Sequence, residues 1–237
     1  MRAVLLAGGK GTRLLPYTVV FPKSLMPLGD MPVIEVVVRQ LRHYGVDHIT
    51  LAVGHLAELL MTFLGDGSRF GLKIDYSRED EPLGTAAPLL LIKDLPETFL
   101  VMNGDVLTTL NYRDLVQAHA VRRNDLTIAS YERDVKIDLG VLETDGGGVV
   151  RDYIEKPTMR YKVSMGVYVF NRAALDYIPP NRYFDFPDLI KAMMNERVVG
   201  TYPYGDVWLD IGRHEDFERA QELFASRRAE FLPGGSE

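Results

Sequence analysis

The sequence contains no cysteine, which excludes disulfide bonds, thiolate catalysis and zinc sites built from cysteine. It is also short of positive charge, because 27 lysines and arginines stand against 33 aspartates and glutamates, a net charge of −6. A nucleic-acid-binding surface normally carries a basic patch, so this balance argues against a nucleic-acid partner.

Long apolar runs are absent as well. No stretch approaches the roughly 20 apolar residues that span a bilayer. After Met1 and Arg2, only five apolar residues precede the Gly8-Gly9 pair, so the N-terminus does not resemble a signal peptide. We therefore expect a cytoplasmic protein with no membrane contact.

What is present is an ordinary globular composition, with 237 residues of which 46% are hydrophobic and 25% charged. The first half alternates short apolar runs, such as residues 3–8 and 48–54, with helical patterns, such as residues 33–44. The second half is richer in short β-type runs. This order predicts one α/β domain over residues 1–228, with a Rossmann-like, mixed and mostly parallel sheet flanked by helices. We expect residues 229–237 to form a flexible tail.

A glycine-rich segment, "LLAGGKGTRLLPYTVVFPKSLMP", follows the first predicted strand at residues 5–27. It is not a Walker P-loop, because Lys10 is followed by Gly11 rather than serine or threonine. It is not the dinucleotide pattern either, because Leu14 stands where the third glycine would be. Glycines still allow backbone N–H groups to approach a polyanion, and Arg13 and Lys23 add positive charge. Without further context, the segment could be a glycine turn with two exposed cations.

The full length of this segment resembles the signature G-G-x-G-T-R-L-x-P-x-T-x-x-x-P-K-x-L-x-P of the sugar-1-phosphate nucleotidylyltransferases. The resemblance extends from residue 1 to about residue 225. It implies that a nucleoside triphosphate binds over the glycine segment and that its nucleoside monophosphate is transferred to a sugar 1-phosphate, with release of pyrophosphate. The nucleotide-binding residues implied here are Leu6, Ala7, Gly8, Gly9, Gly11, Thr12, Arg13 and Lys23.

This chemistry requires cations and positioning rather than a general base, because the attacking phosphate oxygen is already an anion. Asp105 follows the apolar run of residues 98–102, and Asp210 follows a short apolar run that contains the only tryptophan. Each aspartate alone could be a turn residue, but the resemblance implies that both hold Mg²⁺. It makes Arg13, Lys23 and Asp105 the catalytic residues.

The sugar phosphate is the second expected ligand. The segment "YIEKP" matches the E-K-P element of the family, which implies sugar contacts from Glu155 and a phosphate contact from Lys156. Gly140 matches a family glycine that lets backbone approach the sugar. Ser164 replaces an asparagine that is common in the family, which leaves the identity of the sugar open.

The segment "SREDEPLGTAAPL" at residues 77–89 is expected beside the base, at Glu79, Gly84 and Thr85. Family members that use uridine or thymidine triphosphate carry glutamine where this chain has Glu79. A carboxylate can only accept hydrogen bonds, and guanine offers adjacent N1–H and N2–H donors. GTP is therefore the expected donor, unless Glu79 points to solvent and the backbone at Gly84 reads the base.

The form of this segment is closest to single-domain guanylyltransferases that act on mannose 1-phosphate or manno-heptose 1-phosphate. Uridylyl, thymidylyl or cytidylyl transfer to another sugar or cyclitol phosphate remains an alternative. So does a non-catalytic nucleotide-sugar-binding subunit, although such a protein should have lost Arg13, Lys23, Asp105 or Asp210. Relatives often self-associate, so a homo-oligomer is possible.

Overall fold

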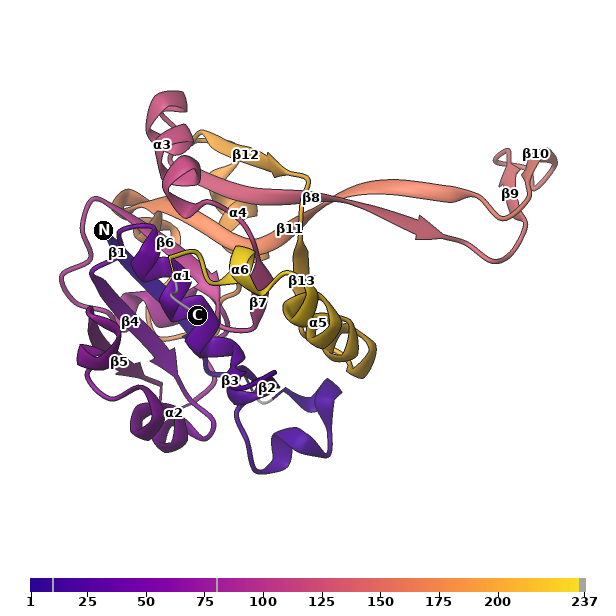
Figure 1. Ribbon diagram of the computed structural model, residues 1–237. Coiled ribbons are helices and arrows are strands. Elements are labelled where there is room, and N and C mark those ends of the chain that lie inside the picture. The colour runs from indigo at the N-terminus through magenta and orange to yellow at the C-terminus, as the bar shows by residue number, and fades with distance from the viewer. Residues whose placement is uncertain (10, 80, 235–237) are drawn as a thin grey trace.

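A seven-stranded sheet forms the centre of the computed structural model, which describes residues 1–9, 11–79 and 81–234 (Figure 1). In spatial order its strands are β12 (Val199–Tyr204), β8 (Leu126–Lys136), β11 (Thr158–Asn171), β6 (Thr98–Asn103), β1 (Arg2–Ala7), β4 (His48–Val53) and β5 (Lys73–Arg78). Only β11 runs against its two neighbours, while the other pairings are parallel. The predicted mixed, mostly parallel sheet is confirmed.

Strand β1 shows how the sheet is covered on both faces. Successive side chains of a strand point to opposite faces, and here Ala3 and Leu5 belong to one apolar cluster while Val4 belongs to another. All three are fully buried. A continuous apolar run is what a parallel strand requires when helices lie on both faces.

The helices divide between these two faces. The Ala3–Leu5 side packs against α1 (Val33–His43), α2 (Ala57–Leu64) and α3 (Tyr112–Arg122), and the Val4 side packs against α4 (Phe186–Met193). The short 3-10 helices are η1 (Thr12–Leu14), η2 (Tyr17–Val19), η3 (Lys23–Leu25), η4 (Ser68–Phe70), η5 (Ala87–Leu91) and η6 (Arg172–Tyr177).

Helix α1 follows directly from its sequence. Ile34, Val37, Val38 and Leu41 recur at helical spacing and are fully buried in the cluster beneath the sheet. The helix ends before Gly45, as predicted.

A third apolar cluster lies between the sheet and the end of the chain. It joins a small antiparallel pair, β7 (Val106–Thr108) and β13 (Trp208–Asp210), to the last two helices, α5 (His214–Ser226) and α6 (Arg228–Phe231). A second small antiparallel pair is formed by β2 (Pro27–Leu28) and β3 (Met31–Pro32). Phe231 is fully buried beside Phe224, with ring centroids 5.9 Å apart. Phe231, expected from the sequence in a flexible tail, thus belongs to the same apolar cluster as Ala220 and Phe224 of α5.

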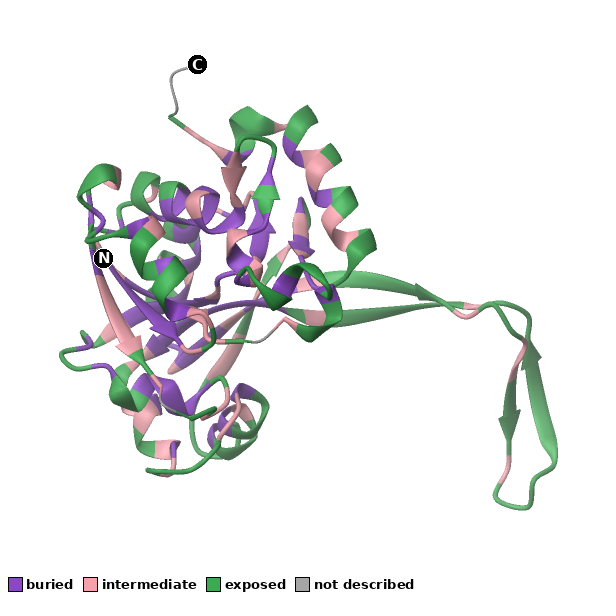
Figure 2. Cartoon of the chain, turned by 90° about the horizontal axis from the view of Figure 1, so that it is seen from below, coloured by how far each residue is buried: buried purple, intermediate pink, exposed green. Residues whose placement is uncertain are grey.

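Strands β8 and β11 continue past the edge of the sheet as a two-stranded ribbon (Figure 1). At its far end lies the hairpin of β9 (Val141–Thr144) and β10 (Val150–Ile154). We call residues 131–163 the arm. Figure 2 shows that almost the whole arm is exposed on both strands. The short β-type runs predicted here exist, but they build a projection rather than additional strands of the central sheet.

Within the described ranges, no helix combines the length and the apolar character that crossing a bilayer would need.

Candidate active site

Two carboxylates meet at the carboxyl end of β6. Asp105 follows that strand, and Asp210 ends β13, which pairs with β7 so that Asp210 lies opposite Val106. The backbone N–H of Ile211 donates to the carbonyl oxygen of Asp105 at 3.2 Å. One small β-pair thus brings together two aspartates that are far apart in the sequence.

Lys23 joins the two carboxylates. Its Nζ forms an ion pair with Asp105 Oδ2 and lies 3.5 Å from Asp210 Oδ1. Burial raises the pKa of the Asp105 carboxyl; the nearby charge of Asp210 adds to this rise, and Lys23 opposes it. Lys23, Asp105 and Asp210, which the sequence predicts for catalysis or metal binding, therefore form one cluster.

This cluster suits a divalent cation. Asp105 Oδ1 is buried and has no hydrogen-bond partner among the described residues, and a buried polar atom of this kind requires an explanation. Among those residues, no group of three or more acidic or histidine side chains is arranged so that it could hold a metal ion. A cation held by Asp105 and Asp210 would complete its shell with phosphate oxygens and water, which is the usual arrangement for Mg²⁺.

A cavity of about 290 Å³ opens beside these carboxylates, over the glycine segment. Its lining is Leu6, Ala7, Gly9, Gly11, Thr12, Arg13, Lys23, Ser24, Gly104 and Asp105. The guanidinium of Arg13 lies against Gly212, where an added Cβ would stand 3.2 Å from its Nη2. The structure thus gathers most of the residues predicted for the phosphates around one opening.

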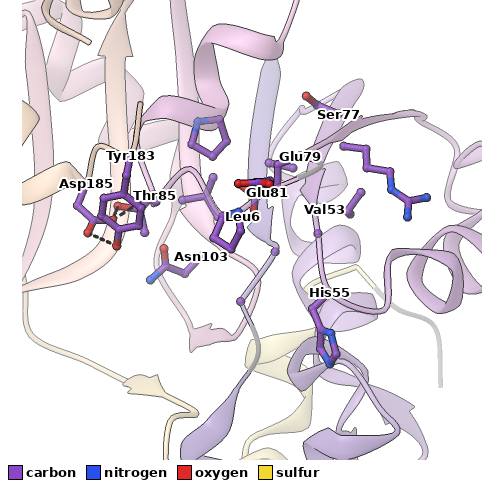
Figure 3. A pocket seen from close by; sticks show the side chains of 18 of the residues that line it. Leu6, Val53, His55, Ser77, Glu79, Glu81, Thr85, Asn103, Tyr183 and Asp185 are labelled. Atoms are coloured by element: carbon purple, nitrogen blue, oxygen red, sulfur yellow. Dashed lines mark hydrogen bonds between the residues drawn. The ribbon is translucent and has the colours of Figure 1, made fainter. Parts of the chain in front are cut away.

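A larger cavity of about 710 Å³ adjoins the first and shares Leu6, Gly9 and Asp105 with it. It extends over Gly8, Glu79, Gly84 and Thr85, the residues predicted to lie beside the base. In Figure 3, Thr85, Tyr183 and Asp185 stand together on one side of this cavity and His55 on another. The two cavities thus adjoin from the glycine segment to the turn of Glu79, and the larger one lies within the range of volumes typical of small-molecule sites.

Glu79 is held at the wall of the larger cavity by its own turn. Its Oε2 accepts a hydrogen bond from the backbone N–H of Leu83 at 3.0 Å. Its Oε1 lies against Gly8 and Gly54, within 2.7 and 2.9 Å of the positions where a Cβ would stand. The absence of side chains at these two glycines leaves room for the carboxylate.

Asp185 and Tyr183 line the same cavity and were not found from the sequence. Asp185 Oδ1 accepts from the N–H and the hydroxyl of Thr85 at 2.8 and 2.9 Å, and its Oδ2 accepts from the Tyr183 hydroxyl at 2.6 Å. Thr85 Oγ1 in turn accepts from the first N–H of α4, that of Phe186. An aspartate before Phe-Pro predicts a helix start, but its contact with Thr85 could not be read from that pattern. Asn103, Gly54 and Gly212 are further site residues that we did not single out.

Gly84 is the most constrained point of this wall. Its φ is +88°, and a Cβ would stand 2.6 Å from the carbonyl oxygen of Phe184. We expect Gly84→Ala to lower the free energy of unfolding by about 2 kcal/mol, because strain and a backbone collision act together. Gly146→Ala is the matched control, since no atom stands within 4 Å there and its φ is not positive. Equal urea midpoints for the two variants would contradict this reading.

The four residues predicted for the sugar phosphate separate into two places. Ser164 lies where the register of β11 shifts; its hydroxyl donates to the Tyr168 hydroxyl at 3.0 Å and accepts from the N–H of Gly166 at 3.3 Å. A Cβ on the neighbouring Gly166 would meet Asn103, which lines the larger cavity, but Ser164 itself lines neither cavity.

Gly140, Glu155 and Lys156 lie in the arm and line neither cavity. The Tyr153 ring covers Gly140 so closely that no Cβ would fit, and its hydroxyl donates to Glu155 at 2.9 Å. Lys156 Nζ lies 3.8 Å from Glu155. Within its own chain, the structure does not bring these three residues to the carboxylate cluster.

The arrangement of glycine loop, paired carboxylates and adjoining cavities agrees with a comparison to known families. The family model described as "Nucleotidyl transferase" matches residues 2–227. The chain belongs to this family. The recognised signature and the predicted fold of this nucleotidyl transferase are thereby confirmed.

The names of individual relatives point to different nucleotides, guanylyl in one case and uridylyl in another. The chain is 33% identical to the mannose-1-phosphate guanyltransferase beta-A of Xenopus laevis, over 92% of its own length and 62% of the relative's. It is 32% identical to a UTP–glucose-1-phosphate uridylyltransferase of Synechocystis, over 96% of its length and 64% of the relative's. The chain thus spans less than two thirds of these proteins.

Solved structures support the fold along nearly the whole chain. The structure of HddC from Yersinia pseudotuberculosis, complexed with GMP-PN, superimposes with a TM-score of 0.73 at 25% identity and covers 94% of this chain and 99% of its own. A putative glucose-1-phosphate thymidylyltransferase from Bacillus anthracis gives a TM-score of 0.78 at 24% identity, covering 100% and 97%. The second likeness concerns the fold alone.

Proposed function

We propose that this nucleotidyl transferase moves a guanylyl group from GTP to a sugar 1-phosphate of the mannose or manno-heptose type and releases pyrophosphate. The observation that carries the proposal is the cluster of Asp105, Asp210 and Lys23 at the junction of two cavities. A protein that only binds nucleotide sugars would have no need for a buried, charged carboxylate, whose desolvation is costly.

The reaction joins two polyanions, so positioning and positive charge are the main requirements. An oxygen of the sugar phosphate attacks the α-phosphorus of GTP, the new P–O bond forms, and the bond to the bridging oxygen of pyrophosphate breaks. The nucleophile is already an anion and no proton has to be removed. Arg13 is placed to bind phosphate oxygens over the glycine segment, and Lys23 places a second cation beside Asp105.

Mg²⁺ is the proposed cofactor, held by Asp105 and Asp210. When bound, it would neutralise charge on the phosphates during transfer. The unpartnered Oδ1 of Asp105 is the atom of this chain that such an ion would satisfy.

The choice of GTP rests on Glu79. Its Oε2 is occupied by the Leu83 N–H, and its Oε1 faces the larger cavity between Gly8 and Gly54. A carboxylate oxygen accepts from both N1–H and N2–H of guanine, whereas uracil presents one N–H between two carbonyl oxygens that it would repel. The guanylyl relatives agree with this assignment, but the uridylyl relative shows that the family name alone does not fix the base.

Replacing Glu79 with glutamine tests the base assignment. The amide oxygen of Glu79→Gln can still accept from the Leu83 N–H, so the turn should be kept, while an amide NH₂ replaces the acceptor that faces the cavity. Loss of a charge-assisted hydrogen bond costs about 1.5–3 kcal/mol, so kcat/KM for GTP should fall roughly 10- to 100-fold relative to UTP. The exposed Glu81, also at the rim of this cavity, provides the matched control as Glu81→Gln. Unchanged GTP preference in Glu79→Gln would remove the basis of the assignment.

The acceptor is tested by a panel. Purified protein, GTP and Mg²⁺ are combined in turn with mannose 1-phosphate, manno-heptose 1-phosphate, glucose 1-phosphate and a cyclitol phosphate, and pyrophosphate release is followed. We expect the highest kcat/KM with a manno-configured acceptor. Preference for glucose 1-phosphate would contradict the proposed sugar class.

A further inference from the structure

Residues 81–86 lie between β5 and η5, and we call them the base turn. The turn follows Glu79 and contains Gly84 and Thr85, and all three of these residues line the larger cavity. Hydrogen bonds weaken steeply when their distance and angle change. A carboxylate and a backbone segment can therefore select one base over another only while the turn that carries them is fixed.

The first anchor of the base turn is the backbone just before α4. The N–H of Phe184 donates to the carbonyl oxygen of Leu83 at 2.9 Å. The carbonyl oxygen of Phe184 in turn accepts from the N–H groups of Ala86 and Ala87 at 3.0 and 3.2 Å. The base turn is thus seated on a segment that lies far from it in the sequence.

The second anchor is the side chain of Asp185. Its Oδ1 accepts from the N–H and the hydroxyl of Thr85, and Thr85 Oγ1 accepts from the N–H of Phe186, all at 2.8–2.9 Å (Figure 3). The threonine hydroxyl is both donor and acceptor here, which fixes its orientation. Burial raises the pKa of Asp185, but hydrogen bonds from Tyr183 and Thr85 outweigh this and lower the pKa below its ordinary value. The acceptor is therefore charged, which strengthens these bonds.

An aspartate at this position would ordinarily serve its own helix. Asp185 is the N-cap residue of α4, and an N-cap carboxylate usually accepts from a backbone N–H of the first turn. Within α4, all of which the structure describes, the Asp185 carboxylate accepts no such bond. The hydroxyl of Thr85 serves the N–H of Phe186 instead. The carboxylate is thus directed at the base turn rather than at the helix.

Leu83 carries this restraint on to Glu79. Its N–H donates to Glu79 Oε2 at 3.0 Å, and its carbonyl oxygen accepts from Phe184. Gly84 comes next along the chain, where a Cβ would stand 3.0 Å from Asp185 Oδ1. A shift of the start of α4 would therefore move the peptide groups on both sides of Leu83 and, with them, the Glu79 carboxylate.

We propose that Asp185 is a positioning residue for base selection. It holds the base turn through Thr85, in the conformation that turns Glu79 Oε1 toward the base. Both of its own oxygens are used within the protein, Oδ1 by Thr85 and Oδ2 by the Tyr183 hydroxyl at 2.6 Å. Asp185 therefore acts through the turn and not on the nucleotide. Which base is selected rests on the proposed function; the restraint of the turn does not.

Kinetics of Asp185→Ala should show a loss of discrimination without a loss of turnover. With saturating acceptor, the KM for GTP should rise about tenfold while kcat stays within about twofold, because the base is held alike in the ground state and the transition state. The kcat/KM for UTP should stay the same, so the preference for GTP over UTP should fall about tenfold. A merely destabilised protein would instead lose kcat for both nucleotides and keep its preference.

Three further variants isolate the hydrogen bonds. Asp185→Asn keeps an acceptor for Thr85 and should recover most of the preference, whereas Thr85→Val keeps the shape without the hydroxyl and should lose it. Asp188→Asn, at an exposed position of α4 outside both cavities, is the matched control and should equal the wild type. Equal preference in Asp185→Ala and Asp188→Asn would overturn the role. If Asp185→Ala does not fold, wild-type preference in folded Thr85→Val would overturn it.

Binding measured without an acceptor separates this role from the proposed function. Calorimetric titrations with GTP and with UTP, each with Mg²⁺, should give a lower Kd for GTP in the wild type and nearly equal values in Asp185→Ala. An unchanged ratio of the two Kd values in Asp185→Ala would overturn the role, and so would a wild type that binds both alike. If the wild type discriminates but transfers no nucleotide to any acceptor, the proposed function fails. Loss of that discrimination in Asp185→Ala would still support the positioning role.

Discussion

Asp105→Asn is expected to fold like the wild type and to lose at least about a thousandfold in kcat, because electrostatic stabilisation of a transferring phosphoryl group is the largest contribution to this kind of catalysis. The substitution keeps the shape of the side chain and removes the charge that would hold the cation. The unpartnered Oδ1 makes this carboxylate the point where loss of charge should matter most.

The stability of the same variant distinguishes a functional from a structural carboxylate. Burial raises the pKa of Asp105, so its charged form is destabilising within the fold. Lys23 keeps Asp210 as a partner at 3.5 Å when Asp105 is neutralised. We therefore expect the Tm of Asp105→Asn to equal or exceed that of the wild type.

The matched control is Asp176→Asn, at an exposed position of η6 outside both cavities. It should change neither kcat nor Tm. Retained Mg²⁺-dependent turnover in Asp105→Asn would contradict the assignment, and so would a large fall in its Tm, because the carboxylate would then serve the fold.

Arg13→Gln should reduce kcat/KM by about 10²- to 10³-fold, the range observed when one donor to a developing anion is removed. Arg13 lines the phosphate cavity and lies against Gly212, and among the described residues no carboxylate pairs with it. Its planar fork is therefore free for phosphate oxygens. Arg13→Lys keeps the charge but loses the bidentate geometry and should recover only part of the activity.

Arg219→Gln, at an exposed position of α5, is the control for this change. Steady-state kinetics with varied GTP check the prediction. If Arg13→Gln and Arg219→Gln showed the same kcat/KM, Arg13 would be a surface residue and the glycine segment would bind phosphate through its backbone alone.

The fold could be predicted from the sequence where the signal is local and repeated. The apolar run of β1 and the stripe of Ile34, Val37, Val38 and Leu41 in α1 have a periodicity that only one element satisfies. The glycine segment and the two aspartates were recognised as a pattern, and the structure places them around one cluster.

The remaining features depend on contacts that no local pattern encodes. Asp185 holds Thr85 across a separation of 100 residues. The alternation of residues 131–135 predicts a strand equally well inside a sheet or in a projecting arm, so the sequence could not place Glu155 and Lys156 away from the cluster. Phe231 was assigned to a tail because two adjacent apolar residues, Phe231 and Leu232, carry no helical periodicity.

One measurement tests the central claim most directly. Wild-type protein is given equal concentrations of GTP, UTP, dTTP and CTP in one vessel, with Mg²⁺ and mannose 1-phosphate or manno-heptose 1-phosphate, and the products are identified by mass spectrometry. We predict a GDP-sugar as the dominant product, formed together with pyrophosphate. A dominant UDP-, dTDP- or CDP-sugar would contradict the role of Glu79, and the absence of any nucleotide sugar would contradict nucleotidylyl transfer to these acceptors.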